Sequence, residues 1–318
     1  MKITLILTLL LFGINVFSQK SKEKKPNATW EYYLNLSKEN CPEAFYILSN
    51  VKAGEFYSSY GLSSTQNELE RVRRLEMVVH EACHGLNDDI SDKVKFTYGY
   101  FIEPGKIINV PIQKVYNSYE LNKVIPDSIQ EKIHRYETYI GEKQLFLGAQ
   151  KYGIYGLLDE FCAYYNGALC QFEMRSWYEK QYGYKVPEPW VSYYIQNIGT
   201  HVAAFYDFRL FMAWYLDYAK KEHPEDYKII SEDVKLKETF ALLYNRFEKL
   251  AQNYEKEVYS IEKILNENGS KVRVDKNFFQ TTHTDKPTYG SGHFLGQIAW
   301  LKTLSKNEVQ DMLNLFMN

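Results

Sequence analysis

The sequence has no marked excess of charge of either sign: 38 lysine and arginine residues face 40 aspartate and glutamate residues in a chain of 318. Proteins that hold nucleic acid or an anionic membrane surface usually carry concentrated positive charge, so this balance argues against both as partners. Internal repeats and low-complexity linkers are also lacking. A chain of this length without such divisions is expected to form a single domain, with room for two helical lobes around a cleft.

Long apolar runs are equally scarce. The one extended run, Ile3 to Val16, covers about 14 residues behind a lysine, which is short of the roughly 20 that a transmembrane helix needs and suits a secretory signal peptide. We therefore predict a signal peptide over residues 1–19. The mature chain, residues 20–318, is expected to be secreted or periplasmic and to have no stable membrane span. An uncleaved N-terminal anchor is the alternative.

Cysteine is rare, with four residues in the chain: Cys41, Cys83, Cys162 and Cys170. An even number permits two disulfides in an oxidising compartment. Cys162 and Cys170 would lie about 12 Å apart on one continuous helix, which is too far for them to pair with each other. The sequence leaves the connectivity open.

What the sequence does contain is a His-Glu-x-x-His segment formed by His80, Glu81 and His84. Residues four apart lie on one face of a helix, so both imidazoles can bind one metal ion. Glu81 lies on the flank of that face, where it can take a proton from a water molecule bound to the ion. The pattern predicts a metal-dependent hydrolase, although two histidines can also share a helix face by chance.

Apolar residues recur at three- and four-residue steps from Leu69 to Leu86, which predicts an amphipathic helix that carries the motif. A capping-box pattern at Thr65 is expected to begin this helix, and the polar residues 87–89 are expected to end it. Residues 54–64 are predicted to form a loop.

The rest of the chain also favours helices. They are predicted for residues 30–49 with a break at Pro42, 127–139, 157–180, 191–221 and 233–265, and for a short C-terminal helix capped at Ser305. A β-hairpin is predicted for residues 94–112, where apolar residues alternate around a Glu-Pro-Gly-Lys turn. It is either a surface hairpin or the edge of a cleft that binds extended peptide. The predicted fold class is therefore mainly α (α+β) with a small β-hairpin or sheet.

A catalytic zinc site needs a third protein ligand. Metzincin peptidases take it from a histidine six residues after the second one, and Ile90 occupies that position here, so that class is excluded. The segment from Asp159 to Tyr164, Asp-Glu-Phe-Cys-Ala-Tyr, is instead similar to the glutamate-containing helix of gluzincin metallopeptidases. The resemblance implies a zincin-like fold in which His80, His84 and Glu160 bind one zinc ion.

The resemblance covers two short segments and has two departures. Glu160 follows His84 by 76 residues, a long separation for this group. Tyr164 stands where thermolysin-like enzymes have an aspartate that orients a zinc-binding histidine. Asp159 or a backbone carbonyl is expected to take that role, because such a histidine usually has an acceptor for its other nitrogen. Glu173 and Glu137 are the alternative ligands.

Peptide hydrolysis also needs a donor for the oxyanion of the intermediate. Tyr289 and His293, in a glycine-rich segment, are the candidates, and His283 is another. The alternative is a plain loop that leads into a helix at Leu295. The other histidines are assigned structural places, His201 in the core and His134 and His223 on the surface.

The sequence thus predicts an exported zinc metallopeptidase that acts on a peptide or protein, with Glu81 as general base. Two rival hypotheses remain open. One is a non-catalytic extracytoplasmic protein that binds a peptide or glycan on a zincin scaffold. The other is a structural helical protein with a chance motif, which predicts that Glu160 lies far from His80.

Overall fold

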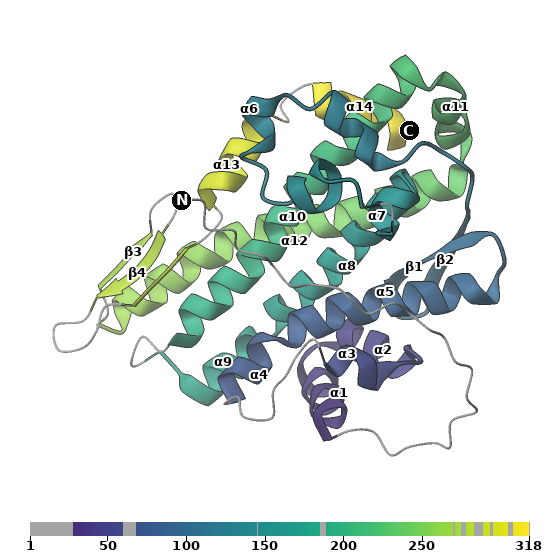
Figure 1. Ribbon diagram of the computed structural model, residues 1–318. Coiled ribbons are helices and arrows are strands. Elements are labelled where there is room, and N and C mark those ends of the chain that lie inside the picture. Colours follow the sequence, from purple (N-terminus) through teal and green to yellow (C-terminus); the bar gives the residue numbers. More distant parts are fainter. Residues whose placement is uncertain are drawn as a thin grey trace, which may run out of the picture.

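The described part of the chain is mainly helical, as the sequence predicts (Figure 1). Besides the predicted hairpin it contains a three-stranded antiparallel sheet that the sequence does not predict. The computed structural model describes residues 28–59, 68–144, 146–184, 189–269, 271–274, 278–282, 289–292, 295–304 and 308–317. The predicted signal peptide, the cap at Thr65 and the cap at Ser305 lie outside the described residues.

The elements follow one another along the chain in three groups. The first comprises α1 (Ala28–Asn40), α2 (Pro42–Asn50), α3 (Gly54–Ser58), α4 (Glu68–Arg73), α5 (Leu75–Lys93), β1 (Thr97–Glu103) and β2 (Lys106–Pro111). The second comprises the 3-10 helix η1 (Ser118–Lys123), α6 (Asp127–Gln130), the π-helical turn η2 (Glu137–Gly141), α7 (Gly148–Lys151), α8 (Ile154–Glu173) and α9 (Arg175–Tyr182). The third comprises α10 (Pro189–Glu222), α11 (Pro224–Glu232), α12 (Val234–Glu267), β3 (Lys271–Val274), β4 (Phe278–Thr282), β5 (Tyr289–Gly292), α13 (Leu295–Leu304) and α14 (Glu308–Met317).

Helix α8 is the centre of the core. Fifteen of its 20 residues are buried, and it packs against α5, α10 and α12. Figure 1 shows these long helices crossing the middle of the molecule, with α1 to α3 beside α5 and with α11 and α14 at the opposite end. The helices that carry His80, His84 and Glu160 are thus held together by the main core.

A glycine brings three of these helices into close contact. A Cβ atom on Gly167 of α8 would lie 2.9 Å from the backbone oxygen of Glu76 on α5 and 3.0 Å from the ring of His201 on α10. Those distances are shorter than carbon atoms tolerate, so only glycine fits without a shift of the neighbouring helices. The contact sets how closely α5 and α10 approach α8.

The hairpin β1–β2 forms where the sequence predicts it. The two strands pair from Thr97 with Pro111 to Glu103 with Lys106, and Gly105 adopts a positive φ of 82° in the turn. Strand β1 is buried against α5, whose side chains occupy its outer edge: the amide of Gly99 donates to Ser91 Oγ at 2.8 Å, and that of Phe101 donates to Asn87 Oδ1 at 2.9 Å. At these two positions β1 has no free donor for an extended peptide.

Several predicted boundaries are wrong. The helix with the motif begins at Leu75, after a turn at Arg74 that separates it from α4. It continues to Lys93, because Asn87 and Ile90 face the core instead of solvent. The helix at Asp127 ends at Gln130, and the long helix after residue 153 is divided at Met174. The predicted loop after residue 53 contains helix α3. The two long helices α10 and α12 and the break at Pro42 confirm the predictions.

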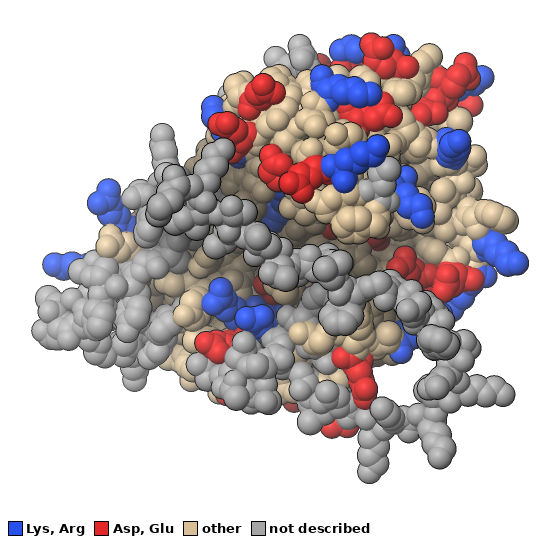
Figure 2. Space-filling model, in the orientation of Figure 1, with Lys and Arg blue, Asp and Glu red and all other residues tan. Residues whose placement is uncertain are grey.

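Within the ranges described above, no helix combines the length and the apolar character that crossing a membrane requires. Figure 2 shows lysine and arginine residues interspersed with aspartate and glutamate residues over the described part of one face.

Glu76, in the first turn of α5, gives the fold a pH dependence. Its side chain is 7% exposed, and burial raises its pKa to about 7, although the amide of Met77 and nearby arginines oppose the shift. The folded state therefore holds the protonated acid more tightly than the unfolded chain does. The free energy of unfolding should fall as the pH rises from the ordinary value of 4.5 to about 7.

We expect a Glu76→Gln variant to lack this decline, because its amide mimics the protonated acid. Its free energy of unfolding should match that of the wild type near pH 4 and exceed it by roughly 3 kcal/mol at pH 8. Urea unfolding across this pH range measures the difference, and other titrating groups cancel in it. Glu238→Gln, an exposed change on α12, is the control. A wild-type curve parallel to that of Glu76→Gln would contradict the prediction.

Candidate metal centre

Helices α5 and α8 bring the three predicted ligands together. His80 and His84 lie one turn apart on α5, and their Nε2 atoms are 3.2 Å apart. Glu160 Oε2, from α8, lies 3.8 Å from Nε2 of His80 and 3.4 Å from Nε2 of His84. The chance-motif hypothesis requires Glu160 to be distant from His80, and this expectation is wrong.

The spacing of these three atoms fits a single small metal ion. Ligand atoms about 2.1 Å from a tetrahedrally bound ion are about 3.4 Å from one another, and atoms on one face of an octahedron are about 3.0 Å apart. The observed separations of 3.2, 3.4 and 3.8 Å are closer to the tetrahedral value. Two imidazoles and one carboxylate also form the ligand set of hydrolytic zinc sites that keep one position open.

Asp159 fixes the orientation of the His84 ring. Its Oδ2 lies 2.6 Å from Nδ1 of His84, and its Oδ1 accepts a hydrogen bond of 2.7 Å from Asn87 Nδ2. With Nδ1–H donating to the carboxylate, the lone pair of the neutral ring is on Nε2, which faces Glu160. The acceptor at Nδ1 of His84 is thus the carboxylate of Asp159 and not a backbone carbonyl, and Asn87 connects this carboxylate to strand β1.

Charge and burial act differently on the two histidines. Burial opposes protonation of His84, but the carboxylates of Asp159 and Glu160 outweigh it and raise its pKa well above the usual value. For His80, burial and the neighbouring charges lower the pKa well below the usual value. A metal ion that binds here must displace the proton of His84, so its affinity should rise with pH.

Glu81 lies beside the cluster and is partly buried. Burial raises its pKa, the charge of Glu160 adds to the shift, and His84 opposes it. Among the residues that the structure describes, no hydrogen bond is made to this carboxylate, so it remains available to a water molecule or a substrate at the cluster.

A second set of buried polar residues, which the sequence analysis missed, lines the other side of the cluster. Tyr139, from η2, donates a hydrogen bond of 3.0 Å to Glu160 Oε2, and its hydroxyl is 3.1 Å from that of Tyr164. The ring of Tyr164 packs 4.4 Å from that of His80, and the guanidinium of Arg135 lies over the Tyr164 ring, 4.4 Å from its centroid. Arg135 is paired at 3.0 Å with the fully buried Asp207 on α10.

Tyr139 and Arg135 gave no signal in the sequence, because both belong to short irregular segments and act through long-range contacts. Tyr164 was identified only as a departure from the family pattern. His201 is buried, as predicted for a core residue, but its ring also lies 6.0 Å from that of His80. Burial and Arg135 lower the pKa of His201 to about 3, so it is a neutral ring beside the cluster.

The remaining candidates lie elsewhere or outside the described residues. Glu137 is exposed on η2 and Glu173 lies near the other end of α8, and neither joins the ligand group. The backbone of Tyr289 forms part of strand β5, which replaces the predicted loop, and its side chain is not described. His283 and His293 lie outside the described residues.

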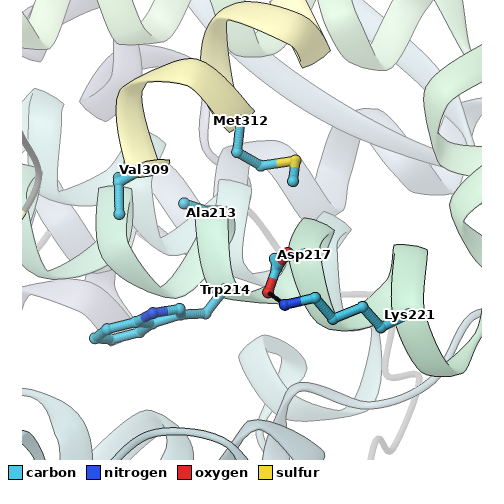
Figure 3. Close-up of a pocket in the computed structure, with 6 residues that line it drawn as sticks. All are labelled: Ala213, Trp214, Asp217, Lys221, Val309 and Met312. Atoms are coloured by element: carbon cyan, nitrogen blue, oxygen red, sulfur yellow. Dashed lines mark hydrogen bonds and ion pairs between the residues drawn. The ribbon is translucent and has the colours of Figure 1, made fainter. Parts of the chain in front are cut away.

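Two surface pockets lie along α10, and His80, His84 and Glu160 line neither of them. Figure 3 shows the first, of about 280 Å³, between α10 and α14. Trp214, Met312 and Val309 supply apolar walls, and an ion pair of 2.7 Å joins Asp217 to Lys221. The second, of about 320 Å³, shares Trp214 and this ion pair and extends toward α6.

Comparison of the chain with known proteins gives no match to a family model, to a curated protein or to a solved structure. The chemistry of the cluster must therefore be argued from its own geometry.

Substitution of Asp159 should separate its effect on stability from its effect on His84. Asp159→Ala leaves the amide of Asn87 without an acceptor and should lower the free energy of unfolding by about 1–3 kcal/mol. Asp159→Asn keeps an acceptor for Asn87 and should lower the free energy of unfolding by less. Its amide would face Nδ1 of His84, so the pKa of His84 should fall and the neutral ring should carry its proton on Nε2.

Urea unfolding measures the first effect, and a pH titration of the histidine ring nitrogens by NMR measures the second. The exposed ring of His134 is the internal reference. An unchanged titration of His84 in Asp159→Asn would show that the carboxylate does not control this ring.

Proposed function

We propose that this protein is a zinc-dependent hydrolase of peptide bonds, of gluzincin type and with a zincin-like fold. The observation that carries the proposal is the convergence of His80 Nε2, His84 Nε2 and Glu160 Oε2 within 3.8 Å of one another. If the motif had arisen by chance, there would be no reason for Glu160, 76 residues after His84, to complete a metal-ligand set with the two histidines. The adjacent, partly buried Glu81 favours hydrolysis over a purely structural metal site.

The residues of the cluster divide into ligands, orienting groups and a proton carrier. His80, His84 and Glu160 would hold one zinc ion, which when bound lowers the pKa of a coordinated water to about 7 and polarises a carbonyl group. Asp159 keeps the lone pair of His84 directed at the ion. Tyr139 donates to Glu160 and so restrains the carboxylate from the opposite side.

Glu81 is the general base in this proposal. A carboxylate whose pKa is raised by burial is better matched to a proton that it must accept and then release. It would take a proton from the attacking water and deliver it to the leaving amine. The donor to the developing oxyanion is assigned, from the sequence, to Tyr289 or His293.

The proposal includes export of the protein. A signal peptide over residues 1–19 would deliver residues 20–318, as one domain, to the periplasm or to the exterior. The substrate would be a peptide or a protein, in keeping with the balanced charge of the chain.

The first test is the zinc content of the purified protein. We expect about one zinc per chain, and a loss of affinity of at least about 100-fold in Glu160→Ala, because removal even of groups that only support a ligand costs 10- to 100-fold. Glu137→Ala, which removes an exposed alternative ligand on η2, should retain the metal. Competition with a chromogenic chelator gives the affinities, and circular dichroism verifies the fold.

Two results would count against the site. Wild-type protein without zinc after reconstitution would end the enzyme hypothesis. Full affinity in Glu160→Ala would move the third ligand to another residue.

The second test concerns turnover of a mixed peptide library, measured by mass spectrometry. Glu81→Gln should lower the rate by about 10²- to 10⁴-fold, the usual contribution of a general base, while its zinc content stays at the wild-type level. Glu76→Gln, five residues earlier on the same helix, should keep its activity. Full activity in Glu81→Gln would refute the assignment, and a zinc-loaded wild type that cuts no peptide would favour the binding-protein hypothesis.

A further inference from the structure

The four cysteines, whose pairing the sequence left open, lie in two pairs. The Sγ atoms of Cys83 on α5 and Cys162 on α8 are 3.8 Å apart. Cys41, directly before α2, contacts Cys170 near the end of α8: its Sγ donates a hydrogen bond to the Cys170 carbonyl at 3.3 Å. All four side chains are thiols in this structure, and all are at most 1% exposed.

We propose that these pairs are two disulfide sites, Cys83 with Cys162 and Cys41 with Cys170, which close when the chain folds in the presence of a disulfide oxidant. In each pair one thiolate attacks the oxidant and forms a mixed disulfide, releasing one thiol. The partner thiolate then attacks the mixed disulfide and releases the second thiol. Two cysteines are oxidised to one disulfide, and the oxidant is reduced to two thiols.

The geometry of the first pair favours this bond. The sulfur atoms must approach by about 1.7 Å to reach bonding distance, which small rotations of two side chains can provide. Both residues lie inside helices that Gly167 already holds in close contact. The main cost is local: the thiol of Cys162 donates to the Phe101 carbonyl at 3.2 Å, and oxidation removes that donor.

Burial determines when the bonds form. The thiolate is the reactive species in disulfide exchange. In the folded protein all four cysteine side chains are at most 1% exposed, so a disulfide oxidant cannot reach them. The thiols of the folded protein are therefore unreactive and shielded, and oxidation belongs to the folding reaction.

The two bonds would join the parts of the fold that form the cluster. Cys83 directly precedes His84, and Cys162 follows Glu160 by two residues, so the first bond links the two helices that carry all three ligand atoms. The second bond ties the start of α2 to the other end of α8. The cysteines are 79 and 129 residues apart in the sequence, and long loops of this kind give the largest gain in stability from a cross-link.

Refolding of the full chain tests the proposal. The denatured, reduced protein is refolded in a mixture of oxidised and reduced glutathione, and free thiols are alkylated in denaturant. We expect no alkylated cysteine, a mass lower by two hydrogens for each bond, and digestion products that link Cys83 to Cys162 and Cys41 to Cys170. Reduction of the bonds should lower the melting temperature by roughly 5–10 °C.

Paired variants keep the test decisive if one bond fails. The double variant Cys83→Ala with Cys162→Ala should retain the bond between Cys41 and Cys170. The double variant Cys41→Ala with Cys170→Ala should retain the bond between Cys83 and Cys162.

Protein folded first under reducing conditions should stay reduced for hours in the same glutathione mixture. Four alkylated cysteines after oxidative refolding, or other pairings, would overturn the proposal. The measurement involves neither metal nor turnover, so its outcome is independent of the proposed function.

Discussion

A buried carboxylate, that of Asp159, is the constraint on which the arrangement of the site depends. An anion in the core is tolerated only when hydrogen-bond donors surround it. Here His84 and Asn87 provide them, both from α5. The two bonds fix the register of α5 against α8. Because Asn87 also accepts from the amide of Phe101, the same carboxylate sets where the hairpin lies. The position of His84 thus follows from the need to satisfy one buried charge.

The buried charges around the cluster are balanced in pairs. Arg135 is neutralised by Asp207, and the ring of Tyr164 separates this pair from His80. Burial and neighbouring charges lower the pKa of His80, while the carboxylates of Asp159 and Glu160 raise that of His84 and favour a proton on its ring. A divalent cation would replace that proton and neutralise the same carboxylates. Either a proton on His84 or a divalent cation would thus offset the negative charge of these carboxylates.

Much of the helical framework could be predicted from the sequence, because periodicity reports which face of a helix is buried. Periodicity predicts helices α10 and α12, and it places the two histidines of the motif on one face of a helix. The resemblance to gluzincins predicts Glu160 as the third ligand, and the structure brings its carboxylate to the two histidines. Asn87 was interpreted as a helix stop because it is polar, whereas its partners, Asp159 and Phe101, are distant in sequence. Local patterns carry no information on such contacts. The short strands β3 to β5, rich in polar residues and glycine, were missed for the same reason.

Helix α8 has a further consequence for the order in which the protein can mature. Its apolar surface is covered on one side by α5, which precedes it, and on the others by α10 and α12, which follow it in the chain. Until those two helices have been synthesised, the segment that carries the candidate ligands exposes an apolar surface of the kind that aggregates in partly folded chains. The residues that line the cluster from α10, Asp207 and His201, also arrive only then. Assembly of the site is thus a late event, completed when the C-terminal half of the chain packs onto the N-terminal half.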